Sequence, residues 1–297
     1  MEEKVIKISI IGASGFIGYR LYKYLINFDN FEVKGTYNLN KKYLYLEKVD
    51  ITNKKSLQYY LLRETSDFVL WIAGNKNIKE CERDYNFAYK INTRPIEDLV
   101  NIICNYKIDT KVLFFSTNYV FEGKDGNYKD NDDRKNPKTN YGKTKLLAEN
   151  ILENSALDYK IVRTSAVMGR GGTFFDWLLK IMNEEKIIKL YSNIYFSPTP
   201  IEFINENIKY IVDNYDKIES KVIHLVGEKH LSRYEFGVKL IKLLQKDNIK
   251  YYPQEVNLEF LLFQKDLSLI QSDFIRTNQK RNLWEYIKEE VENDTIH

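Results

Sequence analysis

The chain opens with the stretch KVIKISII (residues 4–11), GASGFIG (12–18) and YRLYKYLI (19–26). The first run is rich in β-branched residues and predicts a strand buried on both faces, and the last run predicts an amphipathic helix. Between them, Gly12 permits a sharp turn, Gly15 lets the backbone approach a ligand, and Gly18 lets the helix pack closely on the sheet. The unpaired amides at the helix start face the place that a pyrophosphate would take, so the stretch predicts a dinucleotide-binding turn.

Strands alternate with helices through the first half of the chain. We expect strands at 31–37, 67–74, 111–117 and 159–163, and helices at 54–63, at 81–106 as one long segment, and from 140 onward. This alternation predicts right-handed crossovers and an α/β fold with a doubly wound parallel Rossmann sheet over residues 1–165. Residues 166–297 are expected to form a small substrate-binding lobe with helices at 173–185, 201–215 and 233–245. The part from about 201 to 226, including a strand at 221–226, is expected to return to the Rossmann sheet.

The composition of the chain argues against several classes of function. The 297 residues carry a net charge of +3 with both signs scattered, which gives no basic face for nucleic acid. No apolar run approaches the ~18 residues that span a bilayer, so no membrane partner is expected. Two cysteines are too few for a disulfide framework and favour a cytoplasmic location. The three histidines lack metal-ligand spacing, so no metal is expected, and His224 is expected to pack in the core.

The end of the second predicted strand bears on the choice of cofactor. In an NAD-selective site, an acidic residue about twenty residues past the glycines holds the adenosine ribose hydroxyls. Thr36, Tyr37 and Asn38 stand there instead, and Lys41 and Lys42 follow. Lysines attract the 2′-phosphate that a carboxylate would repel, so we expect NADP(H). NAD(H) stays open, because such lysines also suit a solvated loop.

The candidate chemistry lies in NYGKTKLLAE (140–149), which predicts the start of a helix. Tyr141 and Lys145 are four residues apart and share one helical face. A free phenol has a pKa near ~10, and a neighbouring ammonium stabilises the phenolate and moves that pKa towards the working range. A Tyr-x-x-x-Lys pair arises easily by chance in a chain rich in both residues. It gains weight here because it follows a dinucleotide-binding turn and a strand that ends in Ser116 and Thr117.

Together these motifs resemble the extended short-chain dehydrogenases/reductases, and most of all their dTDP-4-dehydrorhamnose reductase branch. The resemblance covers nearly the whole chain in order and is carried by GASGFIG (12–18), STNYVFEG (116–123), YGKTKLLAE (141–149), RTSAVMG (163–169), SPT (197–199), YEF (234–236) and DLSL (266–269). It implies NADPH-dependent reduction of a 4-keto-6-deoxy sugar carried on a nucleoside diphosphate, in activated-sugar and surface polysaccharide biosynthesis.

The resemblance also implies a role for individual residues. Thr117 would hydrogen-bond the sugar carbonyl, Tyr141 would protonate its oxygen, and Lys145 would tune Tyr141 and hold the nicotinamide ribose. Cofactor contacts are implied for Gly12, Ser14, Gly15, Phe16, Ile17, Asp50, Ile51, Ala73, Gly74, Ser116, Lys145, Thr164 and Ser165. Substrate contacts are implied for Asn118, Val120, Phe121, Ala166 and Ser197.

Three departures from the branch pattern fall on the substrate side. Asn118 stands where the branch has Asp, and Ala166 stands where the rhamnose enzyme has a large aromatic side chain. Residues 192–196 replace the usual Asp-Gln lead-in to SPT. The cofactor side is intact, so the reaction class is better specified than the nucleotide, the sugar or the product stereochemistry.

Two other functions stay open on the same resemblance. A nucleotide-sugar epimerase would recycle its cofactor, and a non-catalytic regulatory subunit, as known for one methionine adenosyltransferase, would reuse the fold. A dehydratase is disfavoured, because Asn118 and Tyr119 cannot supply the acid–base pair that it needs after the catalytic Thr. The resemblance also suggests a homodimer formed through segments 81–106 and 140–153.

Overall fold

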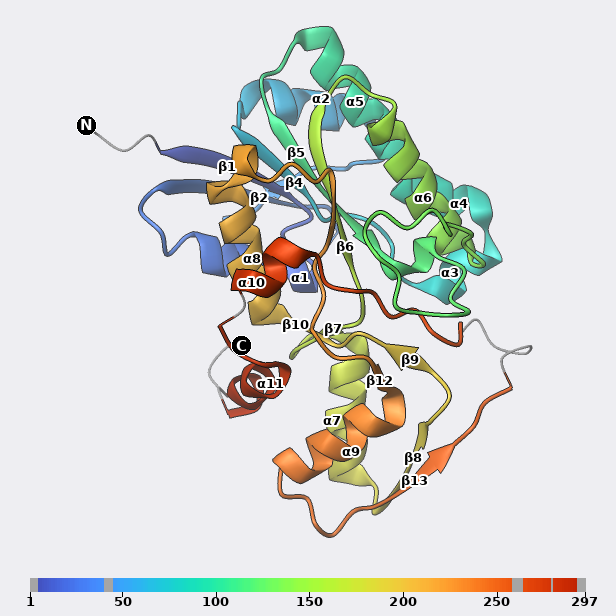
Figure 1. Ribbon diagram of the computed structural model, residues 1–297. Coiled ribbons are helices and arrows are strands. Elements are labelled where there is room, and N and C mark those ends of the chain that lie inside the picture. Colours follow the sequence, from blue (N-terminus) through green and yellow to red (C-terminus); the bar gives the residue numbers. More distant parts are fainter. Residues whose placement is uncertain (1–4, 40–44, 258–263, 279, 293–297) are drawn as a thin grey trace. The chain divides into compact units, whose positions relative to one another are not determined.

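The computed structural model describes residues 5–39, 45–257, 264–278 and 280–292 (Figure 1). By its internal contacts the chain divides into two compact units. The first unit contains Met1–Val120, Thr139–Val162 and Asn205–Ile223, and the second contains Phe121–Lys138, Arg163–Ile204 and His224–His297. The chain therefore passes repeatedly between the units, and each is described below by itself.

A seven-stranded sheet with the order β11-β6-β5-β4-β1-β2-β3 forms the framework of the first unit. Its strands are β1 (Ile6–Ile11), β2 (Phe31–Tyr37), β3 (Glu47–Lys48), β4 (Phe68–Trp71), β5 (Lys111–Thr117), β6 (Asp158–Thr164) and β11 (Val222–His224). The pairs β1–β2, β1–β4, β2–β3 and β4–β5 are parallel. Because the order runs outward from β1 in both directions, the predicted doubly wound sheet is confirmed.

Helices pack against this sheet and cover its apolar side chains. They are α1 (Phe16–Leu25), α2 (Lys54–Arg63), α3 (Ile78–Arg83), α4 (Tyr85–Asn92), α5 (Arg94–Tyr106), α6 (Asn140–Glu153) and α8 (Ile201–Asp213). Figure 1 shows α5 and α6 running side by side, and the two helices are in contact. Buried strand residues such as Trp71 and Phe114 join Leu99 of α5 in one hydrophobic cluster. No helix in the described ranges has both the length and the apolar character needed to cross a bilayer.

The prediction of a single helix over 81–106 is wrong, because the segment holds three helices separated at Asp84 and Thr93. Asp84 is extended (φ −149°, ψ 107°), and its carboxylate accepts a hydrogen bond from Phe87 N at 3.1 Å, which caps α4. Thr93 ends α4, and Pro95 follows in the first turn of α5. Proline has no backbone N–H and its ring clashes with the carbonyl four residues earlier, so it is tolerated in the first turn of a helix but interrupts a continuing one. Thr93, at this break, takes part in the hydrogen-bond network of the site described below.

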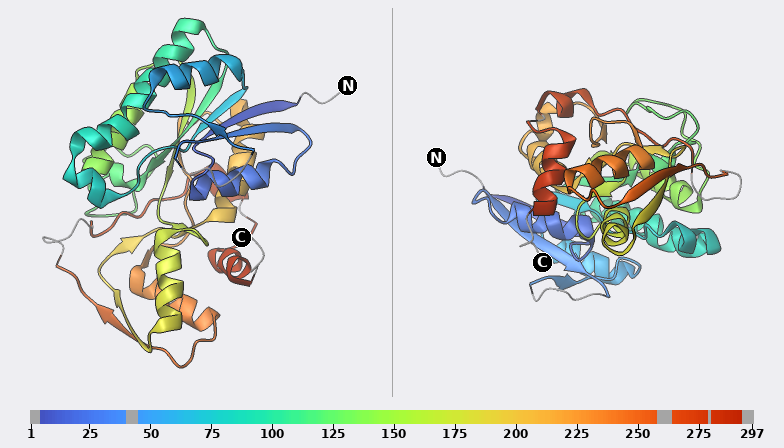
Figure 2. Two further views of the ribbon diagram at one scale, coloured as in Figure 1. Left: turned by 180° about the vertical axis from the view of Figure 1, so that it is seen from behind. Right: turned by 90° about the horizontal axis from the view of Figure 1, so that it is seen from below.

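The second unit is built from short two-stranded sheets and four helices in the described part of the chain (Figure 2). The strand pairs are β7 (Val167–Met168) with β10 (Thr199–Pro200), β9 (Tyr195–Phe196) with β12 (Leu231–Ser232), and β8 (Ile187–Tyr191) with β13 (Lys250–Gln254). The helices are α7 (Thr173–Glu184), α9 (Arg233–Leu243), α10 (Asp273–Asn278) and α11 (Leu283–Glu292). Phe175, Phe196 and Phe236 lie in its hydrophobic core. The helices predicted at 173–185 and 233–245 are confirmed to within two residues.

Candidate active site

The backbone of the turn after β1 lies in close contact with the backbone after β4 and with that of α1. Gly12 has a φ of +94°, and a Cβ there would lie 2.7 Å from the amide nitrogen of Ala73. A Cβ on Gly18 would lie 2.3 Å from the carbonyl oxygen of Gly12. Any side chain at either position would therefore push the turn away from the end of β4 or from the start of α1. The close approach brings Gly12 and Ala73, two predicted cofactor residues, side by side.

The start of α1 offers free backbone donors. Gly15 is the N-cap residue, and no side chain caps the helix there. Gly15 itself is exposed, whereas Ser14, Phe16 and Ile17 are half-buried. A Cβ on Gly15 would meet Gly12 O at 3.4 Å, an ordinary contact, so the space beyond the turn is open. Uncapped amides at an open helix start fit an anionic diphosphate.

The residues expected at the adenosine end have partners of their own. The hydroxyl of buried Thr36 accepts a hydrogen bond from Gly12 N at 3.0 Å, so it supports the turn. The Asp50 carboxylate accepts hydrogen bonds from Thr52 N at 2.9 Å and Thr52 Oγ1 at 2.7 Å, and Ile51 belongs to the hydrophobic core. Lys41 and Lys42, on which the preference for NADP(H) rested, lie outside the described residues. A role of Asp50 and Ile51 at the adenine stays a prediction.

Thr117, Tyr141 and Lys145 come together in the first unit. Thr117 ends β5, and Tyr141 and Lys145 lie in the first two turns of α6. The hydroxyl of Thr139 caps α6 by accepting a hydrogen bond from Gly142 N at 3.0 Å, which fixes where the helix begins. The half-buried phenol of Tyr141 accepts a hydrogen bond from the Thr117 hydroxyl. The helix start thus brings the phenol onto the end of the strand.

The Thr117 hydroxyl has further neighbours. Its Oγ1 lies 3.3 Å from Oδ1 of Asn118, and it accepts from Tyr119 N at 3.3 Å. Because a threonine hydroxyl has one proton, Asn118 and Tyr141 compete for the same donor. The rings of Tyr119 and Tyr141 lie edge to face, with centroids 5.8 Å apart. Tyr119 was not among the predicted site residues, although it lies between two of them in the sequence.

Lys145 is buried one helical turn after Tyr141. Its Nζ donates to the carbonyl oxygen of Phe115 at 2.6 Å and lies 3.8 Å from the ring centroid of Phe114. Burial lowers the pKa of Lys145 to about 7, and the carboxylate of Glu149 acts in the opposite direction. Burial also raises the pKa of Tyr141, more than the hydrogen bond from Thr117 lowers it.

These shifts correct one expectation. The sequence predicts that the Lys145 ammonium lowers the pKa of Tyr141, but in the protein by itself that ammonium is bound to the Phe115 carbonyl and burial dominates. The phenol is therefore held in its protonated form, which is the form that an acid needs.

A hydrogen-bond network supports the second turn of α6. The side-chain oxygen of buried Asn92 accepts from Asn75 N at 2.7 Å, and its nitrogen donates to Thr144 Oγ1 at 3.3 Å. Thr93 Oγ1 donates to the backbone oxygen of Thr144 at 2.8 Å. These contacts join the loop after β4, which contains Ala73 and Gly74, to the helix that carries Lys145. Because the sequence predicted a continuous helix here, Asn92 and Thr93 were not recognised as supports of the site. The signal for a break was Pro95, two residues after Thr93.

Residues 6–259 match the family model described as the RmlD substrate binding domain. The chain belongs to the RmlD family. It is 27% identical over 237 residues to the spore coat polysaccharide biosynthesis protein SpsK of Bacillus subtilis, covering 80% of this chain and 78% of that protein. The predicted resemblance to extended short-chain reductases is thereby confirmed.

Two solved structures share the fold over nearly their full length. A dTDP-4-dehydrorhamnose reductase from Clostridium acetobutylicum superposes with a TM-score of 0.83 at 25% identity, covering 96% of this chain and 98% of that one. A dTDP-4-dehydrorhamnose reductase from Bacillus anthracis, solved in complex with NADP, gives a TM-score of 0.82 at 23% identity with the same coverage. At this identity the second likeness shows the fold alone.

Several predicted site residues of this RmlD-family chain are engaged in internal contacts. Ser116 Oγ donates to the carboxylate of Glu149. Ser197 Oγ both donates to Leu269 O and accepts from Leu269 N, each at 3.0 Å. The ring of buried Phe121 stacks on Tyr128 with centroids 4.3 Å apart. Their roles toward cofactor or substrate stay predictions.

The remaining residues of the two predicted sets lie at the end of β6 and beside η1 (Asn118–Val120). Thr164 Oγ1 donates to Ser165 O at 3.3 Å, and Ser165 Oγ accepts from Ser197 N at 3.4 Å. Ala166 is half-buried, and its carbonyl oxygen accepts from Thr199 N at 3.0 Å. Ser165 and Ser197, which were predicted for different ligands, are therefore neighbours within the second unit.

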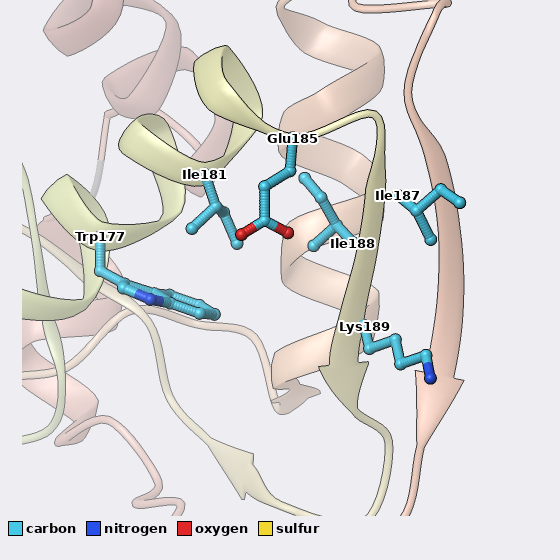
Figure 3. A pocket seen from close by; sticks show the side chains of 6 residues that line it. All are labelled: Trp177, Ile181, Glu185, Ile187, Ile188 and Lys189. Carbon is cyan, nitrogen blue, oxygen red and sulfur yellow. The ribbon is translucent and has the colours of Figure 1, made fainter.

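A hollow of about 380 Å³ lies elsewhere in the second unit, between α7 and β8 (Figure 3). It is lined by Trp177, Ile181, Glu185, Ile187, Ile188 and Lys189, and none of these is a predicted site residue. Within the described ranges, no group of three or more His, Cys, Asp or Glu side chains could hold a metal ion.

Proposed function

We propose that this chain is an NADPH-dependent reductase that acts on a 4-keto-6-deoxy sugar carried on a nucleoside diphosphate. The observation that carries the proposal is the hydrogen bond from Thr117 to Tyr141, with buried Lys145 four residues along the same helix, in the same unit as an open dinucleotide-binding turn. Membership of the RmlD family and the likeness to the dTDP-4-dehydrorhamnose reductase of Clostridium acetobutylicum support the substrate class. The name of the Bacillus subtilis relative supports a place in surface polysaccharide synthesis.

The residues present fit a dinucleotide cofactor. The backbone around Gly12 and Gly15 would hold the diphosphate, because a Cβ at Gly12 would close the turn and the amides at the start of α1 are uncapped. Lys145 uses one of its three donors on the Phe115 carbonyl and keeps others for the nicotinamide ribose hydroxyls. When bound, NADPH supplies the hydride. The NADP complex of the Bacillus anthracis relative supports NADP(H), and NAD(H) remains an alternative.

The chain's own residues would manage the proton. The protonated phenol of Tyr141 donates to the carbonyl oxygen of the sugar, and the Thr117 hydroxyl holds that oxygen in reach of the phenol. Once the phenol has lost its proton, Thr117 and Lys145 stabilise the phenolate. A phenol is protonated near neutral pH even at its ordinary pKa, and burial raises the pKa of Tyr141 further.

Replacing Tyr141 with Phe tests the assignment. We expect Tyr141→Phe to lower kcat/KM by about 10²–10⁴-fold, the usual contribution of a general acid, with NADPH affinity within about threefold of wild type. The assay is NADPH absorbance with keto-sugar nucleotides that vary in base and sugar. Tyr119→Phe is the matched control, since this neighbouring phenol is given no proton to transfer.

The other outcomes separate the alternatives. Full activity of Tyr141→Phe would exclude the proposed role of the phenol. Conversion of a nucleotide sugar without net NADPH consumption would indicate an epimerase. Absence of turnover with every keto-sugar, together with recovery of a stoichiometric partner enzyme, would indicate a regulatory subunit.

We further propose a homodimer formed through α4, α5 and α6, in the cytoplasm. Large apolar side chains are exposed on two of these helices, namely Tyr85, Phe87 and Tyr106. Aromatic side chains are enriched at protein–protein interfaces relative to the rest of a protein surface. Sedimentation equilibrium measures the mass directly, and a monomer at all concentrations would contradict the homodimer.

A further inference from the structure

A second buried charge lies one turn beyond the catalytic lysine. Glu149 is 0% exposed and follows Lys145 by four residues on α6, so the two side chains share a helical face. The hydroxyl of Ser116 donates a hydrogen bond to the Glu149 carboxylate. A buried carboxylate is unfavourable unless a counter-charge and hydrogen bonds compensate it. Nothing in the reaction proposed above uses Glu149.

Lys145 and Glu149 dock on consecutive residues of β5. The Lys145 ammonium binds the carbonyl of Phe115, and Glu149 binds the hydroxyl of Ser116. The next residue of the strand is Thr117, which bonds the phenol of Tyr141. The basic and acidic side chains therefore anchor two consecutive residues of β5, Phe115 and Ser116, directly before Thr117 at the site.

Apart from Glu149, the contacts of the Lys145 ammonium within the described residues are with neutral groups. It contacts a backbone carbonyl and the Phe114 ring, and among the described residues the charge that acts on it is that of Glu149. Lys143 and Glu153 of the same helix are exposed. On the elements packed against α6, the other titratable groups have partners of their own, adjoin Tyr141 or are exposed. Glu82 bonds Asn140 N, Glu97 and Asp98 pair with Arg94, Tyr89 bonds Glu97, Lys111 bonds Asp216, and Cys81 and Tyr119 adjoin Tyr141. The exposed groups are Lys79, Glu80, Arg83, Tyr85, Lys90, Cys104 and Tyr106.

We propose that Glu149 is the positioning residue that keeps Lys145 charged in its buried place and thereby sets the upper pH limit of catalysis. The inference rests on the proposed function. Without the carboxylate, the ammonium would lose its proton at lower pH, because burial alone disfavours the charged form. A neutral Lys145 cannot stabilise the Tyr141 phenolate. Activity would then disappear at a pH where the wild-type enzyme still works.

The decisive variant is Glu149→Gln, which keeps the shape and an acceptor for Ser116 but removes the charge. We expect the alkaline limb of the kcat/KM profile to move down by about one pH unit or more, so that activity falls about tenfold at pH 8 and stays within about threefold at pH 6. Glu149→Asp, which restores the charge, should recover most of the shift. Glu153→Gln is the matched control, since it removes an exposed carboxylate from the same helix.

A second readout does not depend on turnover. We expect the affinity of Glu149→Gln for NADPH, followed by nucleotide fluorescence, to fall with rising pH at lower pH than in wild type, because Lys145 would hold the ribose. A uniform loss of kcat/KM with an unmoved alkaline limb and an unmoved affinity profile would overturn the inference. If wild type lacks reductase activity but the affinity profile still shifts, the proposed reaction fails and the role of Glu149 stands.

Should Glu149→Gln fail to fold, stability supplies the test. We expect Lys145→Met combined with Glu149→Gln to be more stable in urea than Lys145→Met alone, because the double variant buries no unpaired charge. Additive losses of stability would show that the two side chains do not compensate each other.

Discussion

The predicted site residues of the two units differ in what their side chains contact. The comparison is between Thr117, Tyr141 and Lys145 in the first unit and Phe121 and Ser197 in the second. In the first unit, the half-buried phenol of Tyr141 and the Thr117 hydroxyl bond each other, and the phenol keeps its own proton for a ligand. In the second unit, the ring of Phe121 stacks on Tyr128, and the Ser197 hydroxyl both donates to and accepts from the backbone of Leu269. Both side chains are therefore engaged in contacts within the protein. The resemblance gives all of these residues a role in one reaction. The comparison indicates that some of them take part in the reaction, whereas the others support the structure around it.

The largest expected effect lies in the first unit. Thr117→Val should lower kcat/KM by about 10²-fold, near 2.7 kcal/mol of barrier, because it removes a donor to the reacting oxygen. Its unfolding free energy should change little. Thr110→Val is the matched control, since the buried Thr110 hydroxyl has no hydrogen-bond partner and its removal should leave turnover intact. Equal losses in both variants would show that Thr117 acts through packing.

An intermediate effect concerns acid stability of the second unit. His224 is fully buried, its Nδ1 lies 3.2 Å from the carbonyl oxygens of Tyr128 and Ile270, and its Nε2 lies 3.4 Å from the Arg163 guanidinium. Both carbonyls accept and the guanidinium donates, so the imidazole is neutral. Burial, and secondly the Arg163 charge, lowers the pKa of His224 to about 3.

The sign of the pH dependence follows from that shift. The unfolded imidazole binds a proton near pH ~6.5, so between about pH 6.5 and pH 3 the unfolded state binds more protons. Stability should fall as the pH falls through this window, by up to about 1.4 kcal/mol per pH unit from this residue. Urea unfolding at pH 4 to 7 measures the slope, and His224→Gln should flatten it. An unchanged slope would contradict the neutral buried imidazole.

The smallest expected effect tests whether Phe121 supports the fold or contacts the substrate. Phe121→Leu should lower the unfolding free energy by about 1 kcal/mol through the lost ring stack, while KM for the keto-sugar nucleotide stays within about twofold. If KM instead rises about tenfold and stability is unchanged, Phe121 contacts substrate as the resemblance implies, and the difference between the two units disappears for this residue.

Prediction succeeded where the signal is local. The bounds predicted for β2, α2 and β5 match those in the structure, because each element is a short periodic run with clear turn residues at its ends. The prediction of one helix over 81–106 was wrong, because a side-chain cap at Asp84 and the missing donor and ring clash of Pro95 outweighed the apolar periodicity. Asn92 and Glu149 were missed as site supports, since their partners Thr144 and Ser116 lie 52 and 33 residues away.

The amino-acid sequence by itself determined the glycine turn, the strand–helix alternation and the shared face of Tyr141 and Lys145, because these depend on backbone sterics and on a period of a few residues. The tertiary structure alone decided that the Lys145 ammonium binds the Phe115 carbonyl and that Glu149 lies buried behind it. It also decided that burial raises the pKa of Tyr141. Desolvation depends on every atom that displaces water from a group, and those atoms come from distant parts of the chain.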